Sequence, residues 1–335
     1  MRSNSIKWMP SLLIMVSGVI PSTAEAASDV IPLYSFNQSP LVQIYGLPAL
    51  GSARVLEQDK VDVSLQIQIA NNSTDALNNV EYLVLDGETH RLTLVFRQGL
   101  VNGYEWGVEL PYLSHSSGFM DNFIEDWHRT FGLRQGNRLS IPPNLINYHY
   151  SRNGTELVNV SRSTKGIGDI RLSSGMQLSH SLGGRNVALR ASLKIPTGES
   201  ADLLGSGSTD LALWLSVAPG TKTADSWRGY GGGGILLLTD GDVLPDQQRN
   251  YVAFGNIGLS YRIIPSLTAY VQLDAHSAFY RNSDFRQLNA TAFQGLLGVL
   301  WEFTPGKYAG FSISEDLTVD ASPDFGVNLS VSFSF

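Results

Sequence analysis

The sequence contains no cysteine among its 335 residues. A disulfide framework and a lipid-anchored N-terminal cysteine are therefore both excluded. Basic residues are also scarce, since 23 Lys and Arg stand against 30 Asp and Glu, a formal net charge of −7 at pH 7. Proteins that bind nucleic acid gain affinity from an excess of positive charge, so this balance argues against nucleic acid as a partner.

Long apolar runs are missing as well. Beyond the first 26 residues, no stretch approaches the ~18 consecutive apolar residues that a membrane-spanning helix needs. Strands that cross a bilayer alternate apolar and polar side chains, so a β-barrel remains compatible with this modest hydropathy. The glycine run Gly231–Gly234 is not followed by the Lys-Ser or Lys-Thr of a phosphate-binding loop. The sequence predicts no cofactor and no metal ion.

The N-terminus has the features of a secretory signal peptide. Arg2 and Lys7 supply positive charge, residues 8–20 are apolar but too short to span a bilayer, and Ala24-Glu-Ala26 is a small-x-small cleavage motif. We expect residues 1–26 to direct export through the Sec pathway and then to be removed. An uncleaved anchor helix is the alternative. Removal changes the formal net charge from −7 to −8.

The C-terminus ends in an unbroken period-two pattern. Apolar side chains occupy every odd position from Phe325 to Phe335, and glycine, asparagine or serine occupies every even one. Such a strand at a free edge in water would promote aggregation, but it suits the closing strand of a barrel with lipid outside and a polar interior. The ending resembles the signal that the barrel-assembly machinery reads in bacterial outer-membrane barrels. Residues expected to carry this signal are Val331, Phe333 and Phe335.

Similar alternation along the chain predicts an all-β protein, a transmembrane antiparallel up-and-down β-barrel of about 12 strands spanning residues 53–335. An even number of strands returns both termini to the same side, which we expect to be the periplasm. The segment 113–165 is then expected to be extracellular or tucked into the outer mouth of the barrel. Predicted strands cover residues 61–69, 79–98, 104–112, 166–178, 187–195, 211–217, 229–238, 249–264, 267–275, 290–303, 308–315 and 325–335.

Four segments depart from this alternation. Residues 27–52 contain three prolines and predict an irregular lead-in, either periplasmic or plugging the lumen. Asn71–Asp75 predicts a turn, and Asp86-Gly87 predicts either a kink within one long strand or a hairpin. Residues 113–165 form the longest irregular stretch, within which aromatic residues every four positions predict a short amphipathic helix near 119–131. These aromatic residues are Phe119, Phe123, Trp127 and Phe131.

Charged residues on the predicted strands share one parity. A charge facing lipid near the membrane midplane costs about 2–4 kcal/mol, so the charged face is expected to line the lumen. These side chains could set selectivity along a substrate path, or form a salt-bridge ladder that braces a closed lumen. Opposite charges on adjacent strands favour the ladder. Expected lumen-lining residues are Arg91, Arg97, Glu105, Glu109, Asp169, Arg171, Arg190, Lys194 and Asp210.

A second polar group lies in and before the predicted helix. Asp121, Glu125 and His128 are spaced to share one helix face, and His115 lies just upstream. Carboxylates and imidazoles so arranged could hold a divalent metal or support acid–base catalysis. His115-Ser-Ser-Gly118 also resembles the His-x-Ser-Asn-Gly motif of outer-membrane phospholipases, with glycine in place of the asparagine. The alternative is an interfacial or lumen-plugging helix with a solvated polar face.

Several motifs carry a family resemblance. With Gly166-Ile-Gly-Asp169, Lys194-Ile-Pro-Thr-Gly198 and Gly205-Ser-Gly-Ser-Thr-Asp210, the chain resembles transporter-like outer-membrane barrels that include the meta-pathway phenol-degradation family. With the wider run from Asn37-Gln-Ser-Pro40 through Asp86-Gly-Glu88 and His115-Ser-Ser-Gly-Phe-Met-Asp121, it resembles a proteobacterial family of unknown function in the same group. The resemblance implies an outer-membrane β-barrel that moves small molecules, and it assigns no site residues.

Three functions remain open. The first is channel-like passage or transport of small molecules, the second is an outer-membrane hydrolase that uses the His115–His128 region, and the third is a structural barrel. A channel needs a continuous lumen, whereas a hydrolase needs a nucleophile, a base and oxyanion donors that converge near the membrane rim. The expected location is the bacterial outer membrane. Expected partners are outer-membrane lipid, the barrel-assembly machinery and a small-molecule substrate.

Overall fold

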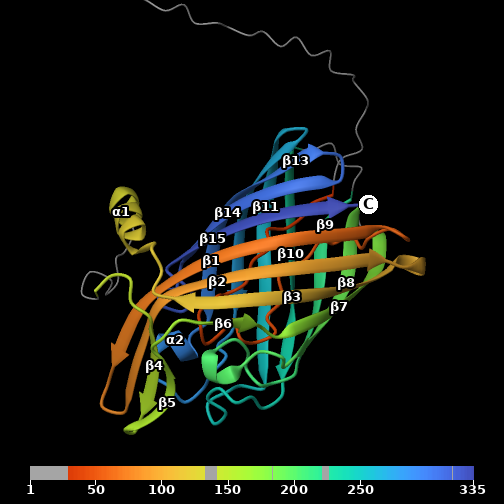
Figure 1. Ribbon diagram of the computed structural model, residues 1–335. Coiled ribbons are helices and arrows are strands. Elements are labelled where there is room, and N and C mark those ends of the chain that lie inside the picture. The colour runs from red at the N-terminus through yellow and green to blue at the C-terminus, as the bar shows by residue number, and fades with distance from the viewer. Residues whose placement is uncertain (1–28, 133–141, 183, 221–225, 319) are drawn as a thin grey trace, which may run out of the picture.

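Twelve strands close into an antiparallel barrel, as the sequence predicts (Figure 1). The computed structural model describes residues 29–132, 142–182, 184–220, 226–318 and 320–335, so the expected signal peptide lies outside the described residues. Pairing of β15 with β1 closes the barrel, with Val63 opposite Phe333 and Gln68 opposite Asn328. The barrel strands are β1 (Val61–Leu77), β2 (Glu81–Gly99), β3 (Tyr104–Ser116), β7 (Ile170–Leu182), β8 (Arg185–Ile195), β9 (Asp210–Pro219), β10 (Trp227–Leu238), β11 (Tyr251–Ile264), β12 (Leu267–His276), β13 (Ala292–Thr304), β14 (Lys307–Asp316) and β15 (Phe325–Ser334).

The two ends of the barrel differ in the length of their connections. At one end, the short-turn end, β11 and β12 are joined by two residues and β13 and β14 by two more, while the 3-10 helix η1 (Val101–Gly103) joins β2 to β3. At the other end, the long-loop end, the connections include η3 (Ser200–Asp202) and the short helix α2 (Arg286–Asn289). Short periplasmic turns and long extracellular loops are typical of outer-membrane barrels.

Strands β1 and β2 extend beyond their neighbours at the long-loop end. Asn71–Asp75 continues β1 and pairs with β2 from Glu88 to Val84, so the predicted turn is wrong. The ladder with β2 gives these residues regular strand pairing in spite of their turn-forming side chains. Gly87 has a φ of 147°. Before Gly87, β2 pairs with β4, and after it β2 pairs with β3, while β2 itself continues as one strand. The single-strand interpretation of Asp86-Gly87 is therefore confirmed, and the hairpin is wrong.

The segment 113–165 contains more regular structure than predicted. It holds β4 (Asn147–Arg152), β5 (Thr155–Val160) and the start of β6 (Thr164–Ile167). β4 and β5 form a hairpin through Asn153-Gly154, both with positive φ, a turn typical of such pairs. The expectation of an irregular stretch is wrong for this part of the chain. In the sequence, the alternation of Tyr148 and Tyr150, which are buried, with His149 was the pattern that indicated β4.

The predicted amphipathic helix is present as α1 (Asp121–Phe131), and it lies outside the barrel wall (Figure 1). Ile124 and Met120 pack with Phe325, next to outward-facing side chains of β1, β14 and β15. Other aromatic residues of this segment are largely exposed, with Phe119 at 68% and Phe131 at 61%. The helix therefore fills no part of the lumen, and an interfacial position fits its exposed rings.

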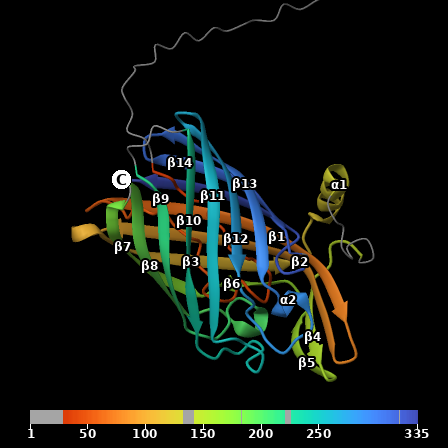
Figure 2. The ribbon, with the colours of Figure 1, turned by 180° about the vertical axis from the view of Figure 1, so that it is seen from behind.

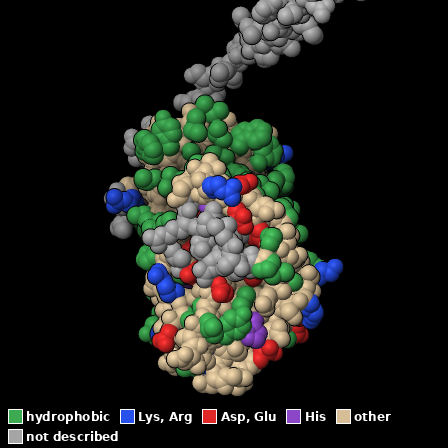
Figure 3. Space-filling model, turned by 90° about the vertical axis from the view of Figure 1, so that its left-hand side faces the viewer, with side chains coloured by type: hydrophobic (Ala, Val, Ile, Leu, Met, Phe, Trp, Pro, Cys, Tyr) green, Lys and Arg blue, Asp and Glu red, His purple; other side chains and the backbone are tan. Residues whose placement is uncertain are grey.

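The outer wall of the barrel is apolar and the inner wall is polar, as the parity of the strands predicts. Outward side chains such as Leu65, Leu94 and Leu215 are exposed, while inward Gln66, Thr93 and Ser216 are buried. Figure 3 shows large apolar side chains gathered over the upper part of one face, with a more polar lower part. Among the described residues, no helix is both long and apolar enough to cross a membrane.

Candidate functional site

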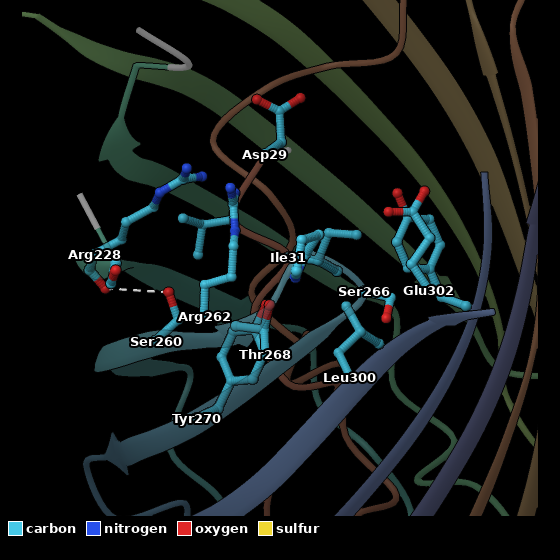
Figure 4. Close-up of a pocket in the computed structure, with 14 residues that line it drawn as sticks. Asp29, Ile31, Arg228, Ser260, Arg262, Ser266, Thr268, Tyr270, Leu300 and Glu302 are labelled. Atoms are coloured by element: carbon cyan, nitrogen blue, oxygen red, sulfur yellow. Dashed lines mark hydrogen bonds between the residues drawn. The ribbon is translucent and has the colours of Figure 1, made fainter. Parts of the chain in front are cut away.

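Residues 29–60, here called the N-terminal segment, occupy the barrel lumen (Figures 1 and 2). The segment enters at the short-turn end, where Asp29 and Ser266 line the same small pocket (Figure 4). It reverses near the long-loop end, where the carbonyl of Ser39 accepts hydrogen bonds from the N–H groups of Val42 and Gln43. It then returns to β1 at the short-turn end. Its buried apolar side chains are Val30, Leu33, Phe36, Leu41, Val42, Ile44, Tyr45, Leu47, Leu50, Ala53 and Val55.

Side chains of the barrel wall and of one long loop satisfy the backbone of this segment. Gln272 accepts a hydrogen bond from the Leu33 N–H at 3.1 Å. Tyr280 donates to the Leu41 carbonyl at 2.8 Å, and Gln177 accepts from the Val55 N–H at 3.1 Å. A chain without helix or sheet needs such partners when its polar groups are buried. The wall therefore substitutes for secondary structure and holds the segment in one position.

The most deeply buried charged cluster centres on Lys194, which is 1% exposed. Its ammonium group donates to Asp169 at 2.6 Å and lies 3.2 Å from Asp210. It also donates to the Ile44 carbonyl at 3.1 Å, while Asp210 accepts from the Gly46 N–H at 2.7 Å. This cluster joins β8, β9 and Asp169, which directly precedes β7, to the returning half of the N-terminal segment.

A second cluster centres on Glu105 near the short-turn end. Glu105 forms a salt bridge with the buried Arg190 and lies 3.7 Å from Arg97. It accepts a hydrogen bond from the Leu56 N–H at 2.7 Å, and Arg190 donates to the Ser52 carbonyl at 2.9 Å. Both clusters therefore combine the salt-bridge ladder expected from the sequence with direct contacts to the N-terminal segment.

The third cluster lies around Phe36 of the N-terminal segment. The guanidinium carbon of Arg91 lies 4.9 Å from the centre of the Phe36 ring, and that of Arg171 lies 5.1 Å from it. Arg171 also lies 3.6 Å from Glu109, which accepts a hydrogen bond from the Tyr34 hydroxyl at 3.1 Å. All nine residues expected to line the lumen thus lie inside the barrel.

Arg97 differs from the other lumenal cations because its side chain is 25% exposed. It donates to Asp62 at 3.1 Å and faces a cavity rather than the N-terminal segment. Its partner Glu105 keeps Arg190 and the Leu56 N–H when Arg97 is removed. We therefore expect Arg97→Ala to lower the free energy of unfolding by only about 0–1 kcal/mol.

This expectation is checked by urea unfolding of the detergent-solubilised barrel, followed by its heat-modifiable migration. Arg190→Ala provides the comparison, because Arg190 is 6% exposed and bonds the same carboxylate. A larger loss for Arg97→Ala than for Arg190→Ala would contradict the assignment of Arg97 to the solvated wall.

A cavity of about 900 Å³ remains beside the N-terminal segment. One wall is formed by inward-facing polar side chains of β1, β14 and β15, including Ser64, Gln66, Ser330 and Ser332. The cavity extends to the short-turn end, since Phe335 and Gly306 also line it. The charged side chains that contact the N-terminal segment therefore come from β2, β3, β8, β9 and the start of β7, whereas a hydroxyl-rich wall on β1, β14 and β15 faces the cavity.

The entrance of the N-terminal segment is lined by a smaller polar pocket (Figure 4). Arg228, Arg262 and Glu302 project into it from three strands, and Asp29 enters from the segment. Arg54 donates to Asp29 at 3.1 Å, yet burial outweighs this contact and raises the pKa of the Asp29 carboxyl group.

The residues considered for catalysis or metal binding are not brought together. His115 faces the lumen, fully buried, with its ring nitrogens 2.9 Å from the Thr89 hydroxyl and 3.1 Å from the Leu203 carbonyl. Asp121, Glu125 and His128 lie on α1 outside the wall, where Asp121 accepts a hydrogen bond from Asn71. In the part of the chain that the structure describes, no three metal-ligating side chains cluster. His115 therefore lies on the inner side of the wall, whereas Asp121, Glu125 and His128 lie on its outer side.

Sequence reasoning missed several lumenal residues. Gln272 and His276 on β12 bind the N-terminal segment, His276 through Asn37 at 2.8 Å, and Asp62 on β1 binds Arg97. The alternation of apolar and polar residues in β1 and β12 already indicated that these side chains face the lumen. Tyr280 lies in a loop, where no pattern in the sequence points to the lumen.

A closed barrel with an apolar outer belt and a polar lumen defines the class of outer-membrane β-barrels built like channels. Within that class, the chain belongs to the family described as "Protein of unknown function (DUF3187)", whose model matches residues 9–335. The resemblance to a family of unknown function is thereby confirmed.

The structure is similar to the crystal structure of the COG4313 outer membrane channel from Pseudomonas putida F1. The TM-score is 0.56 at 13% identity, covering 84% of this chain and 98% of that chain, a likeness that shows a shared fold. The NanC porin gives a TM-score of 0.45 at 10% identity, covering 82% of this chain and 98% of that chain. No curated protein matches the sequence.

Proposed function

We propose that this protein is an outer-membrane channel that passes small molecules when the N-terminal segment moves within or out of the lumen. The observation that carries the proposal is the pairing of an obstructing segment with a hydroxyl-rich cavity of about 900 Å³ that runs beside it to the short-turn end. A barrel with only a structural role has no need of such a cavity. The barrel's similarity in fold to an outer-membrane channel supports the same conclusion.

The proposal extends to export and orientation. Residues 1–26 direct passage through the Sec pathway, and the barrel-assembly machinery reads Val331, Phe333 and Phe335, all of which face outward. The short-turn end then faces the periplasm and the long-loop end the exterior, with outer-membrane lipid around the belt. The N-terminal segment enters its channel from the periplasmic side.

A disulfide that fixes the N-terminal segment tests this function. A Cβ placed on Gly46 would lie 2.9 Å from the Cβ of Asp210, so a small shift brings the pair to the ~3.5–4.5 Å of a disulfide. The chain has no cysteine of its own. We expect Gly46→Cys/Asp210→Cys to conduct in planar bilayers when reduced and to lose conductance when oxidised, because the segment can no longer move.

Each single-cysteine variant serves as a control and should respond to neither oxidation nor reduction. Equal conductance of the oxidised and reduced double variant would show that movement of the segment does not open the lumen. Absence of conductance from the native protein at every voltage would oppose a channel altogether.

A further inference from the structure

Phe36 lies beside two buried arginines, and its ring compensates their positive charge only in part. Arg91 and Arg171 are 3% and 2% exposed, and both guanidinium groups lie within about 5 Å of the ring centre. An aromatic face attracts such cations, more strongly where water is excluded. The two arginines also repel each other, and Glu109 is the only carboxylate that forms a salt bridge with either of them among the described residues. Arg91, Arg171 and Glu109 together carry one more positive charge than negative charge, and the neighbouring cluster of Lys194, Asp169 and Asp210 carries the opposite excess.

One hydrogen-bond donor in this cluster is left over. The Nε of Arg171 is buried and has no hydrogen-bond partner within the described chain, while one Nη lies 3.6 Å from Glu109 in the salt bridge and the other donates to the Tyr45 carbonyl at 3.1 Å. The hydrogen bond of Arg91 donates from Nε to the Thr93 hydroxyl at 3.2 Å. Buried donors without acceptors are costly, and planar guanidinium groups are well suited to a carboxylate.

We propose that Arg91 and Arg171 form a binding site for a small aromatic carboxylate, in which the Phe36 side chain now occupies the position of the aromatic ring. The ligand ring would replace that of Phe36, and its carboxylate would accept hydrogen bonds from the guanidinium N–H groups. The site lies between the cavity that Tyr34 and Glu109 line and a small pocket lined by Phe36 and Asn37. This inference rests on the proposed channel function, to which it adds a substrate class.

The test uses the full-length protein with Phe36→Ala, which empties the ring position and keeps other contacts of the N-terminal segment, such as Leu33 with Gln272. We expect equilibrium dialysis of the detergent-solubilised variant to show benzoate binding at least tenfold tighter than in the native protein. Adding Arg171→Gln should remove at least tenfold of that affinity. Heat-modifiable migration of each variant verifies that the barrel is folded.

Phe279→Ala is the matched control, because Phe279 is another buried phenylalanine, stacked on Tyr45 and outside the small pocket that Phe36 lines. Benzoate binding equal in the Phe36 and Phe279 variants would overturn the site. So would equal binding of benzyl alcohol, which lacks the charge, or of cyclohexanecarboxylate, which lacks the aromatic ring. Full competition by equimolar inorganic phosphate would reduce the site to a general anion site and overturn it as stated. None of these results bears on the disulfide test, so the two proposals fail separately.

Discussion

Replacement of Lys194 by alanine is expected to lower the free energy of unfolding by about 3–5 kcal/mol. Lys194 is the shared partner of Asp169 and Asp210, which are 6% and 0% exposed. Without the ammonium group, two carboxylates remain close together in the barrel interior, and the Ile44 carbonyl loses its donor. Repulsion between the two carboxylates and the loss of hydrogen bonds both lower the free energy of unfolding. This is therefore the largest stability effect that we expect from a single lumenal substitution.

A second substitution should recover part of the loss. Asp210→Asn removes one of the two stranded charges, so Lys194→Ala/Asp210→Asn should be more stable than Lys194→Ala alone. The measurement is the urea midpoint for loss of the compact, fast-migrating form of the barrel. Lys165→Ala is the control, since Lys165 is exposed on β6 and should change the midpoint little. An equal midpoint for the two lysine variants would refute the assignment of Lys194 as the centre of a buried network.

Removal of Phe335 is expected to reduce the amount of barrel in the outer membrane several-fold. Phe335 is 65% exposed, and its backbone exchanges hydrogen bonds with Val61 at 2.8 and 3.2 Å. Burial of a phenylalanine side chain contributes about 1.5–3 kcal/mol, and this ring is mostly exposed, so its direct contribution to the folded barrel is smaller than that. A large effect on assembly would therefore arise from recognition of the terminal aromatic during insertion.

Phe335→Ser separates recognition from stability, because it keeps the length of the chain. Phe303→Ser is the matched control, since Phe303 is another exposed phenylalanine of the outer wall near the short-turn end. Quantitative immunoblots of outer-membrane fractions should show a marked loss for Phe335→Ser and little change for Phe303→Ser. Equal amounts of both variants would remove the special role assigned to the terminus.

The barrel itself could be predicted from the sequence because alternation is a local property of a strand. Each residue of β8 or β15 faces lipid or lumen according to its parity alone, so Lys194 could be assigned to the lumen without knowledge of its partners. The turn expected at Asn71–Asp75 failed because pairing with β2 outweighed the local preference of the side chains.

The arrangement of the lumen could not be predicted in the same way. The N-terminal segment has no period, because wall side chains rather than a neighbouring strand bind its backbone. Leu33 and Gln272 are 239 positions apart, and so are Leu41 and Tyr280. Nothing near Phe36 in the sequence indicates that two arginines from β2 and β7 lie over its ring.

The reversal of the N-terminal segment gives it a mechanical direction. Both of its ends lie at the short-turn end, so tension on the chain at Asp29 loads the contacts of Leu33 first and those of Asn37 afterwards. Contacts near the pulled end carry the load before those deeper in the lumen. From the long-loop end there is only the closed bend at residues 39–45, which offers no free strand to draw on. A pull from the short-turn side therefore acts on an end of the segment, whereas a pull from the long-loop side acts on its bend.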